Sequence, residues 1–287
     1  MKTKTHKSTS THGILFKFMV FFLFCCQLQA QRINRTEFKD TMQRIPAFTI
    51  HEDNYFITGV PTNMAVNSRT ANAKYQISFK QIISRNTLPW DSYAYLTYTQ
   101  KAFWDIYQES YPFKEINFHP TVGVGRAFFD KNDELKGIGT FNFEHESNGR
   151  DSIFSRTWNR FSIGYHTAIG SKTVLSVKGW VPFGYKNGNP DLLDYVGLGE
   201  LRLSYDFIPN RFSFEIKLRK GLQWDTRGMV RTRLYYRPFK NKGNQYFMLE
   251  WFAGHTENLI NYERFTSMVR FGYVIKTIEL DFLKSKN

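Results

Sequence analysis

The sequence predicts an all-β fold, a transmembrane antiparallel β-barrel of about twelve strands. Three observations lead to this prediction. The chain opens with an export signal, and the rest alternates apolar and polar residues in segments of about ten residues. After the signal, no apolar stretch approaches the roughly 20 residues that a membrane helix needs. Aromatic residues make up 17% of the chain although its mean hydropathy is −0.45, a combination that suits an outer-membrane barrel.

Residues 1–30 have the layout of a secretory signal peptide. Basic residues open the segment, residues 14–26 form an apolar run broken only by Lys17, and Ala30 offers a small residue for cleavage. Both cysteines of the chain lie in this segment, so the mature protein is expected to contain no disulfide.

The mature chain is basic. Four of the 39 basic residues and none of the 25 acidic residues belong to the signal segment, which leaves a net charge of +10. An exported protein rarely meets nucleic acid, so we expect no nucleic-acid partner. The basic residues are instead expected to line the barrel interior or to meet lipid phosphates.

Strict alternation identifies the strands. In residues 201–207 the odd positions are Leu, Leu, Tyr and Phe, whereas the even positions are Arg, Ser and Asp. Because successive strand side chains point to opposite faces, each such segment has one apolar and one charged wall. A soluble β-sandwich could show the same period, but dense charge opposite large aromatic residues favours a barrel. Twelve strands are predicted near residues 54–60, 73–83, 92–105, 117–130, 135–147, 158–168, 173–185, 197–207, 211–219, 229–239, 245–256 and 265–282.

The mature chain shows no repeat and no linker, which predicts a single barrel domain over residues 54–287. Residues 31–53 are expected to form an N-terminal leader before the first strand. An even number of strands places both chain ends on the same side of the barrel.

Polar residues interrupt the apolar wall at one place. The predicted strand near 135–147 ends in His145 and Ser147, which both fall on its lipid-facing side. In the next predicted strand, Asn159 shares the apolar wall with Phe161. Three polar side chains on neighbouring strands are therefore expected to share the outer surface of the barrel near one rim.

These three residue types suit nucleophilic catalysis. A serine hydroxyl becomes a good nucleophile when a neighbouring imidazole takes its proton. An asparagine carbonyl can hold that imidazole in one tautomer, as aspartate does elsewhere. Strand residues two apart project in parallel about 6.5–7 Å apart, so the side chains of His145 and Ser147 could close to hydrogen-bonding distance. The alternative is that these polar groups merely mark the membrane rim, where they cost little.

The same segment resembles the signature of a known family. His145-Glu-Ser-Asn-Gly-Arg150, followed by Ser155-Arg-Thr-Trp-Asn-Arg160, is similar to the marked sequence of the outer-membrane phospholipase A family. Tyr98-Thr-Gln-Lys101 and Ser110-Tyr-Pro-Phe113 resemble further marked segments of that family. The likeness extends over roughly residues 50–282.

The resemblance implies a calcium-dependent enzyme of the bacterial outer membrane. It would cleave acyl esters of membrane phospholipids with A1 and A2 specificity, and lysophospholipids as a further expectation, with the active site facing the outer leaflet. Matched position by position, Ser147 is the nucleophile, His145 the general base and Asn159 the orienting residue. The main-chain amide of Gly149 matches the oxyanion donor, which acts with a calcium-bound water.

The resemblance also implies an active homodimer. The matched calcium ligands are the main-chain carbonyl of Arg150 and Ser155, completed by Ser110 of the partner subunit. Gln100 matches a glutamine at the dimer interface. Because few carboxylates occupy the matched positions, we expect weak calcium affinity.

Two other functions stay open at this point. A lipopolysaccharide deacylase could share a serine–histidine pair, and a non-enzymatic porin-like barrel could retain the motif without activity. A packed interior would argue against a pore, and the products formed from lipids would separate the two hydrolases.

Overall fold

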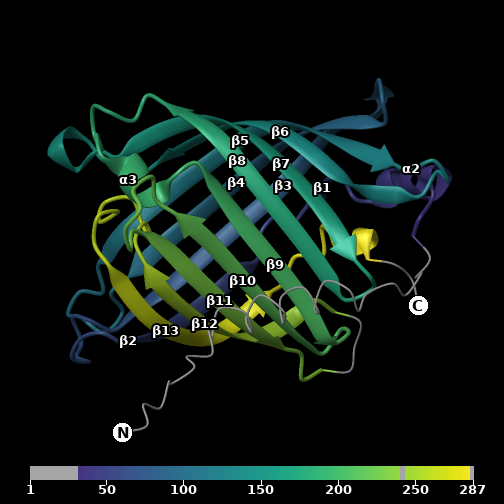
Figure 1. Ribbon diagram of the computed structural model, residues 1–287. Coiled ribbons are helices and arrows are strands. Elements are labelled where there is room, and N and C mark those ends of the chain that lie inside the picture. The colour runs from purple at the N-terminus through teal and green to yellow at the C-terminus, as the bar shows by residue number, and fades with distance from the viewer. Residues whose placement is uncertain (1–31, 240–242, 285–287) are drawn as a thin grey trace, which may run out of the picture.

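Alternating residues build a closed antiparallel wall of twelve strands in the computed structural model, which describes residues 32–239 and 243–284 (Figure 1). The predicted barrel is therefore confirmed, whereas the predicted signal peptide lies outside the described residues. The strands of the barrel are β2 (Asn54–Pro61), β3 (Asn72–Leu88), β4 (Ser92–Trp104), β5 (Phe113–Phe129), β6 (Leu135–Ser147), β7 (Thr157–Ile169), β8 (Thr173–Phe183), β9 (Gly199–Ile208), β10 (Phe212–Lys220), β11 (Gly228–Tyr236), β12 (Gln245–Gly254) and β13 (Thr266–Ile275).

Closure comes from the pairing of the last strand with the first. Each strand runs antiparallel to its neighbour in sequence, and β13 pairs with β2 through partners such as Tyr273 and Phe56. The two-residue strand β1 (Phe48–Thr49) pairs with β3 at Gln81, on the edge of β3 that continues beyond its pairing with β2. A closed ladder leaves no exposed strand edge, which is the condition for a sheet to span lipid.

The two walls follow the period of two. On β6 and β7, Phe141 and Ile163 are exposed on the outer face, whereas Asn142 and Ser162 between them are buried in the interior. Outer side chains of this kind face lipid in membrane barrels.

Ion pairs fill the interior. Glu250 is fully buried and bonds Lys74 as well as Arg233, whose Nε donates to it at 2.8 Å. Arg270 donates to Glu257 at 2.6 Å, and Glu257 also accepts from Lys74, so the network links β3, β11, β12 and β13 inside the barrel. A cavity of about 280 Å³ remains in the interior. Buried charges in such a lumen are tolerated because each faces partners of opposite sign.

The two ends of the barrel differ. At one end the connections are mostly short, with three to five residues over 89–91, 130–134, 170–172 and 209–211, and a longer one over 237–244. At the other end they are mostly longer, over residues 62–71, 105–112, 148–156, 184–198, 221–227 and 255–265, and include helix α3 (Leu192–Val196). Short turns on the periplasmic side and longer outer loops are typical of outer-membrane barrels.

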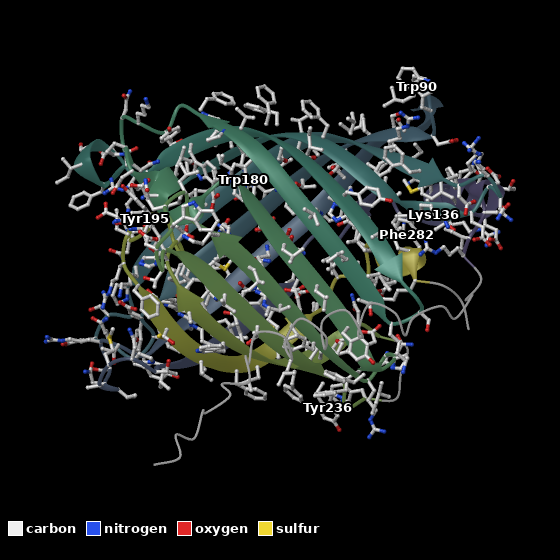
Figure 2. All side chains as sticks on the ribbon, in the orientation of Figure 1. Trp90, Lys136, Trp180, Tyr195, Tyr236 and Phe282 are labelled. Atoms are coloured by element: carbon white, nitrogen blue, oxygen red, sulfur yellow. The ribbon has the colours of Figure 1, made fainter. Side chains whose placement is uncertain are left out.

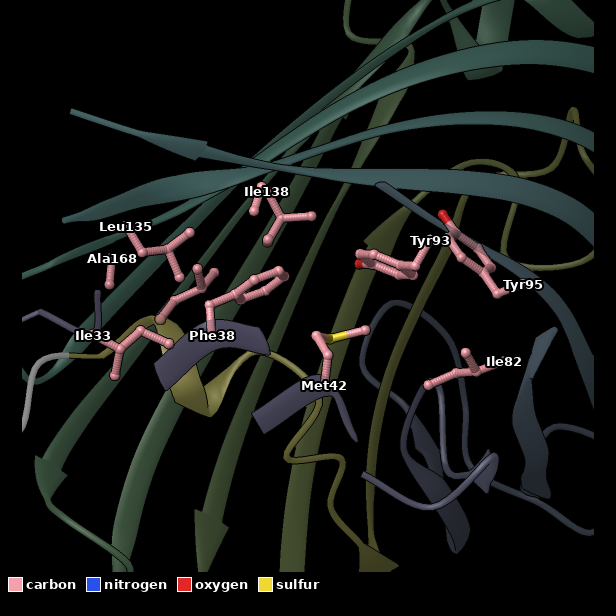
Figure 3. Packing of buried hydrophobic residues seen from close by; sticks show 11 residues of the cluster. Ile33, Phe38, Met42, Ile82, Tyr93, Tyr95, Leu135, Ile138 and Ala168 are labelled. Atoms are coloured by element: carbon pink, nitrogen blue, oxygen red, sulfur yellow. The ribbon is translucent and has the colours of Figure 1, made fainter. Parts of the chain in front are cut away.

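Helix α2 (Arg35–Arg44) covers the short-turn end. Asn34 begins it with a capping box, because its side chain accepts from the amide of Glu37 at 2.9 Å and the Glu37 carboxylate accepts from the amide of Asn34. Phe38 and Met42, four residues apart, share one face and point toward the barrel wall (Figure 3). Within the described ranges, no helix is long and apolar enough to cross a bilayer.

The predicted end of the last strand is wrong. β13 ends at Ile275 rather than near 282, because continued alternation would place Glu279 and Asp281 on the lipid-facing wall of Phe271. The chain instead turns toward the barrel mouth, where a short 3₁₀ helix η2 (Asp281–Leu283) packs near α2.

Residues 276–284 are held there by charge and ring contacts. The Glu279 carboxylate bonds Lys80 and accepts from His51 Nδ1 at 2.7 Å. The Phe282 ring lies 6.1 Å from that of Phe38. The aromatic residue near the C-terminus therefore closes the mouth with α2 instead of ending the last strand.

Acid is expected to release residues 276–284. Burial of the Glu279 carboxyl raises its pKa, but Lys80 and His51 outweigh this effect, so the pKa in the folded protein lies below the ordinary value of 4.5. A lowered carboxyl pKa stabilises the fold fully above 4.5, and this contribution declines progressively as the pH falls from 4.5 toward the lower pKa of the folded protein. Amide hydrogen exchange of the segment, corrected for intrinsic rates, should show protection at about pH 7 that falls by about pH 3. Glu279→Gln should lose the protection already at neutral pH, and unchanged protection of the unmodified chain in acid would contradict the assignment.

Candidate functional site

The register of β6 and β7 sets His145 directly opposite Asn159. Asn159 Oδ1 accepts a hydrogen bond from His145 Nδ1 at 2.8 Å. With Nδ1 committed in this way, Nε2 is left as the basic nitrogen of the ring. The predicted base and orienting residue are therefore in contact.

Ser147 ends β6, two residues beyond His145 on the same outer wall, and pairs across the strands with Thr157 and Phe118. No hydrogen bond joins Ser147 Oγ to the imidazole in the part of the chain that the structure describes. Catalytic hydrogen bonds are often long or poorly aligned until substrate binds. The lack of a Ser147–His145 hydrogen bond is therefore compatible with a nucleophile that engages its base when substrate is bound.

Aromatic rings surround the approach to the site on the lipid-facing wall. Phe161 packs between Phe143 and Phe183, with ring centroids 5.6 and 5.4 Å apart. Their outer faces are exposed, and Asn159 pairs with Phe183 across the strands. His145, Ser147 and Asn159 thus lie at the long-loop edge of an apolar, aromatic wall that hydrocarbon chains can cover.

The inner neighbours of His145 fix the strand from behind. Glu144 is buried, binds Ser162, and accepts from Arg160 Nε at 2.9 Å and from His119 Nε2 at 2.8 Å. Glu146 accepts from the Trp158 indole at 3.1 Å. Bonds on both sides of His145 hold the β6 backbone against β7, and with it the distance from imidazole to Asn159.

The loop after Ser147 is organised by Asn148, whose role sequence reasoning missed. This buried side chain donates to the Phe154 carbonyl at 2.9 Å and accepts from the amide of Arg156 at 2.9 Å and from that of Arg150 at 3.3 Å. Its place before a glycine is a turn signal, but its partners across the loop could not be read from the sequence.

Gly149 requires its glycine. Its φ is +65°, and a Cβ there would lie 2.8 Å from the Phe118 ring. The backbone conformation and the close ring both disfavour larger residues. Gly149 is an exposed residue two positions after Ser147.

Two of the predicted calcium ligands flank the 3₁₀ helix η1 (Ser152–Phe154). The Arg150 guanidinium donates to the Lys114 carbonyl and forms an ion pair with the buried Glu115 carboxylate, whose Oε2 lies 3.1 Å from Nε. These contacts engage the positive charge of the Arg150 side chain, so the main-chain carbonyl of Arg150 remains a candidate calcium ligand. Ser155 is half-buried at the other end of the helix. A carbonyl and a hydroxyl oxygen are hard donors of the kind that calcium prefers, so the residues present fit the ion.

The single chain does not complete this donor set. Ser110 lies exposed in the neighbouring loop 105–112, and in the described residues nothing joins it to Arg150 or Ser155. The described residues also hold no group of three or more His, Cys, Asp or Glu suited to a metal ion. Gln100 lies half-buried on β4, where it accepts from the Tyr98 hydroxyl at 3.0 Å.

Gly184 is a second residue that sequence reasoning missed. It follows β8 with a φ of +65°, and a Cβ at this position would lie 2.9 Å from Asn159 Nδ2. Because Asn159 bonds His145 through its other amide atom, Gly184 leaves the space in which this amide is seated. Gly184 and Asn159 meet across two strands, so no local sequence pattern predicts their contact.

Known proteins resemble this chain over most of its length. The family model described as phospholipase A1 matches residues 28–275. Phospholipase A1 of Salmonella typhimurium is 29% identical over 222 residues, which cover 75% of this chain and 73% of that protein. A relative from Neisseria meningitidis is 27% identical over 221 residues, covering 74% of this chain, and the chain spans 56% of that relative's length.

A solved structure shares the fold. The outer membrane phospholipase dimer of Salmonella typhi with bound calcium superposes with a TM-score of 0.72 at 24% identity, covering 83% of this chain and 97% of that one.

Replacing Gly184 by alanine is expected to slow the reaction of Ser147 with a serine-directed fluorophosphonate by about tenfold or more, because a displaced Asn159 no longer orients the base. Gly170→Ala is the matched control, since Gly170 has the same φ of +65° but a Cβ there meets nothing within 4 Å. Labelling rates measured by mass spectrometry check the difference, and equal rates in the two variants would contradict the role of Gly184.

Proposed function

The chain belongs to the phospholipase A1 family, a family of carboxylic ester hydrolases, and it is a β-barrel of the bacterial outer membrane; on this basis we propose that it hydrolyses the acyl ester bonds of membrane phospholipids in the outer leaflet. The observation that carries the proposal is the 2.8 Å hydrogen bond between His145 and Asn159, on the lipid-facing wall beside Ser147. A base already held by its orienting residue suits acyl transfer.

In the proposed reaction Ser147 Oγ attacks the ester carbonyl carbon while His145 takes the hydroxyl proton. The main-chain amide of Gly149 donates to the oxygen that becomes negative. When the ester bond breaks, His145 returns the proton to the departing alcohol, which leaves as a lysophospholipid. Water activated by His145 then attacks the acyl group on Ser147, which releases a fatty acid and restores the serine.

The position of the site supports a lipid substrate. Ser147 and His145 stand on the outer wall at the end with the longer loops, above exposed Phe143 and Phe161. A phospholipid in the adjacent leaflet can bring its ester to the level of Ser147 while its acyl chains stay in hydrocarbon. An open apolar wall does not select one of the two acyl esters of a phospholipid. We therefore propose both A1 and A2 specificity, with lysophospholipids as further substrates.

Calcium and a second subunit complete the proposed site. The Arg150 carbonyl and the Ser155 hydroxyl would hold the ion, with Ser110 of the partner subunit. When bound, calcium would supply positive charge near the developing oxyanion. The exposed Ser110 and the outward Gln100 of β4 support assembly through this side of the barrel, and the solved Salmonella typhi relative is a calcium-bound dimer.

A pore is disfavoured by a specific observation. Buried ion pairs such as Glu250 with Arg233 line the interior, and α2 with residues 276–284 covers the short-turn mouth. A lipopolysaccharide deacylase would use the same nucleophile and base, so the identity of the released products distinguishes it from a phospholipase.

Purified mature protein should release fatty acid from phospholipid in mixed micelles when calcium is present. Ser147→Ala should lower the rate by at least about 10³-fold, because the nucleophile is lost. Chelation of calcium should lower it strongly in the unmodified protein. Ser171→Ala, in a turn at the opposite end of the barrel, is the matched control and should keep full activity. Equal release by Ser147→Ala, or no release from correctly folded protein, would overturn the proposed function.

A further inference from the structure

Arg126 is a cation on the lipid-facing wall. It lies on β5 with exposed Val122, Val124 and Phe128 on the same face. Its cross-strand partners are the small residues Ser92 on β4 and Gly139 on β6. A charged residue on the lipid-facing wall destabilises a barrel strongly at the bilayer centre but only slightly near a membrane interface.

Two aromatic rings hold the Arg126 side chain. The guanidinium carbon lies 5.6 Å from the centre of the Trp90 ring and 5.2 Å from that of Phe128. Trp90 is 72% exposed and projects away from the barrel at the end that carries α2 (Figure 2). Aromatic faces restrain a guanidinium and attract its charge while leaving the planar edge with its N–H donors free.

Two acidic residues at this end pair with other cations. Asp91 binds Arg35 and Lys39, the latter at 3.2 Å, and Asp130 binds Lys136 at 2.8 Å. In the part of the chain that the structure describes, no acidic side chain pairs with Arg126. Its donors therefore face outward, toward whatever anion the membrane surface supplies.

The level of Arg126 identifies that anion. It lies three residues before the end of β5, beside the short turn 89–91, at the membrane interface opposite the one where Ser147 lies. The abundant anionic group at such an interface is the phosphate of phospholipid headgroups, and a guanidinium matches phosphate oxygens with two parallel donors.

We propose that Arg126, with Trp90 and Phe128, forms a binding site for the phosphate of a phospholipid in the periplasmic leaflet. The acyl chains of this lipid lie along the outer wall over Val124 and Val122. This site is separate from the proposed catalytic centre: it holds a lipid on the leaflet away from Ser147 and does not cleave it.

Native mass spectrometry in a phosphate-free detergent tests the proposal. All variants carry Ser147→Ala and are measured with chelator, so that no lipid is consumed. Phosphatidylglycerol is the probe, diacylglycerol is the matched lipid without phosphate, and inorganic phosphate is the soluble anion. Lys220→Gln is the control variant, because Lys220 is a cation at the opposite end of the wall whose ammonium already bonds loop carbonyls.

Arg126→Gln is expected to weaken phosphatidylglycerol binding by about tenfold, with Arg126→Lys in between, because a charge-assisted bidentate bond is lost. Diacylglycerol should bind all variants alike, and Lys220→Gln should match the parent. Equal phosphatidylglycerol binding by Arg126→Gln and the parent would overturn the site. Binding of inorganic phosphate with the same dependence on Arg126 would overturn the lipid assignment in favour of a soluble anion.

Discussion

The closed antiparallel ladder is the constraint on which every other feature depends. Hydrocarbon offers no partner to a backbone amide, so each strand must bond both neighbours and the last must meet the first. Once β13 pairs with β2, the period of two assigns each side chain to lipid or to the interior. The interior then receives charges such as Arg233 and Glu250, which stabilise one another only because the ladder brings them together.

The same ladder explains why the candidate site faces outward. Strand register, rather than a pocket, sets His145 against Asn159, and the bonds of Glu144 and Glu146 behind them keep that register rigid. Polar groups on the lipid-facing wall destabilise the barrel least near the rim, which is where β6 ends at Ser147. The candidate site therefore lies where a lipid ester and water can meet, whereas the residues of the lumen stabilise the barrel.

Much of this could be predicted from the sequence because period-two alternation is a local signal. The strands near His145, their walls and the placement of His145 and Asn159 on the same outer wall all follow from parity, whereas the direct contact depends on the register of β6 and β7. The end of β13 could also have been read from parity, since Glu279 and Asp281 fall on the lipid wall, but the inward turn depends on Lys80, His51 and Phe38 far away in the sequence.

What escaped prediction arises from contacts between segments that no local pattern links. Gly184 acts on Asn159 across the β7–β8 pair, and Asn148 bonds atoms up to eight residues away around a loop. Arg126 looks like an ordinary interfacial charge until Trp90 and Phe128 are found beside it. Such residues are found by asking what each buried or close-packed atom touches.

The central claim is that β6–β7 register holds the imidazole of His145 in one tautomer through Asn159. Nitrogen NMR of the protein labelled with ¹⁵N-histidine, assigned by comparison with His145→Ala, measures this directly. His145 is expected to carry its proton on Nδ1, and Asn159→Ala is expected to change the tautomer balance or the Nδ1 chemical shift. A neutral ring protonated on Nε2, unaffected by Asn159→Ala, would contradict it.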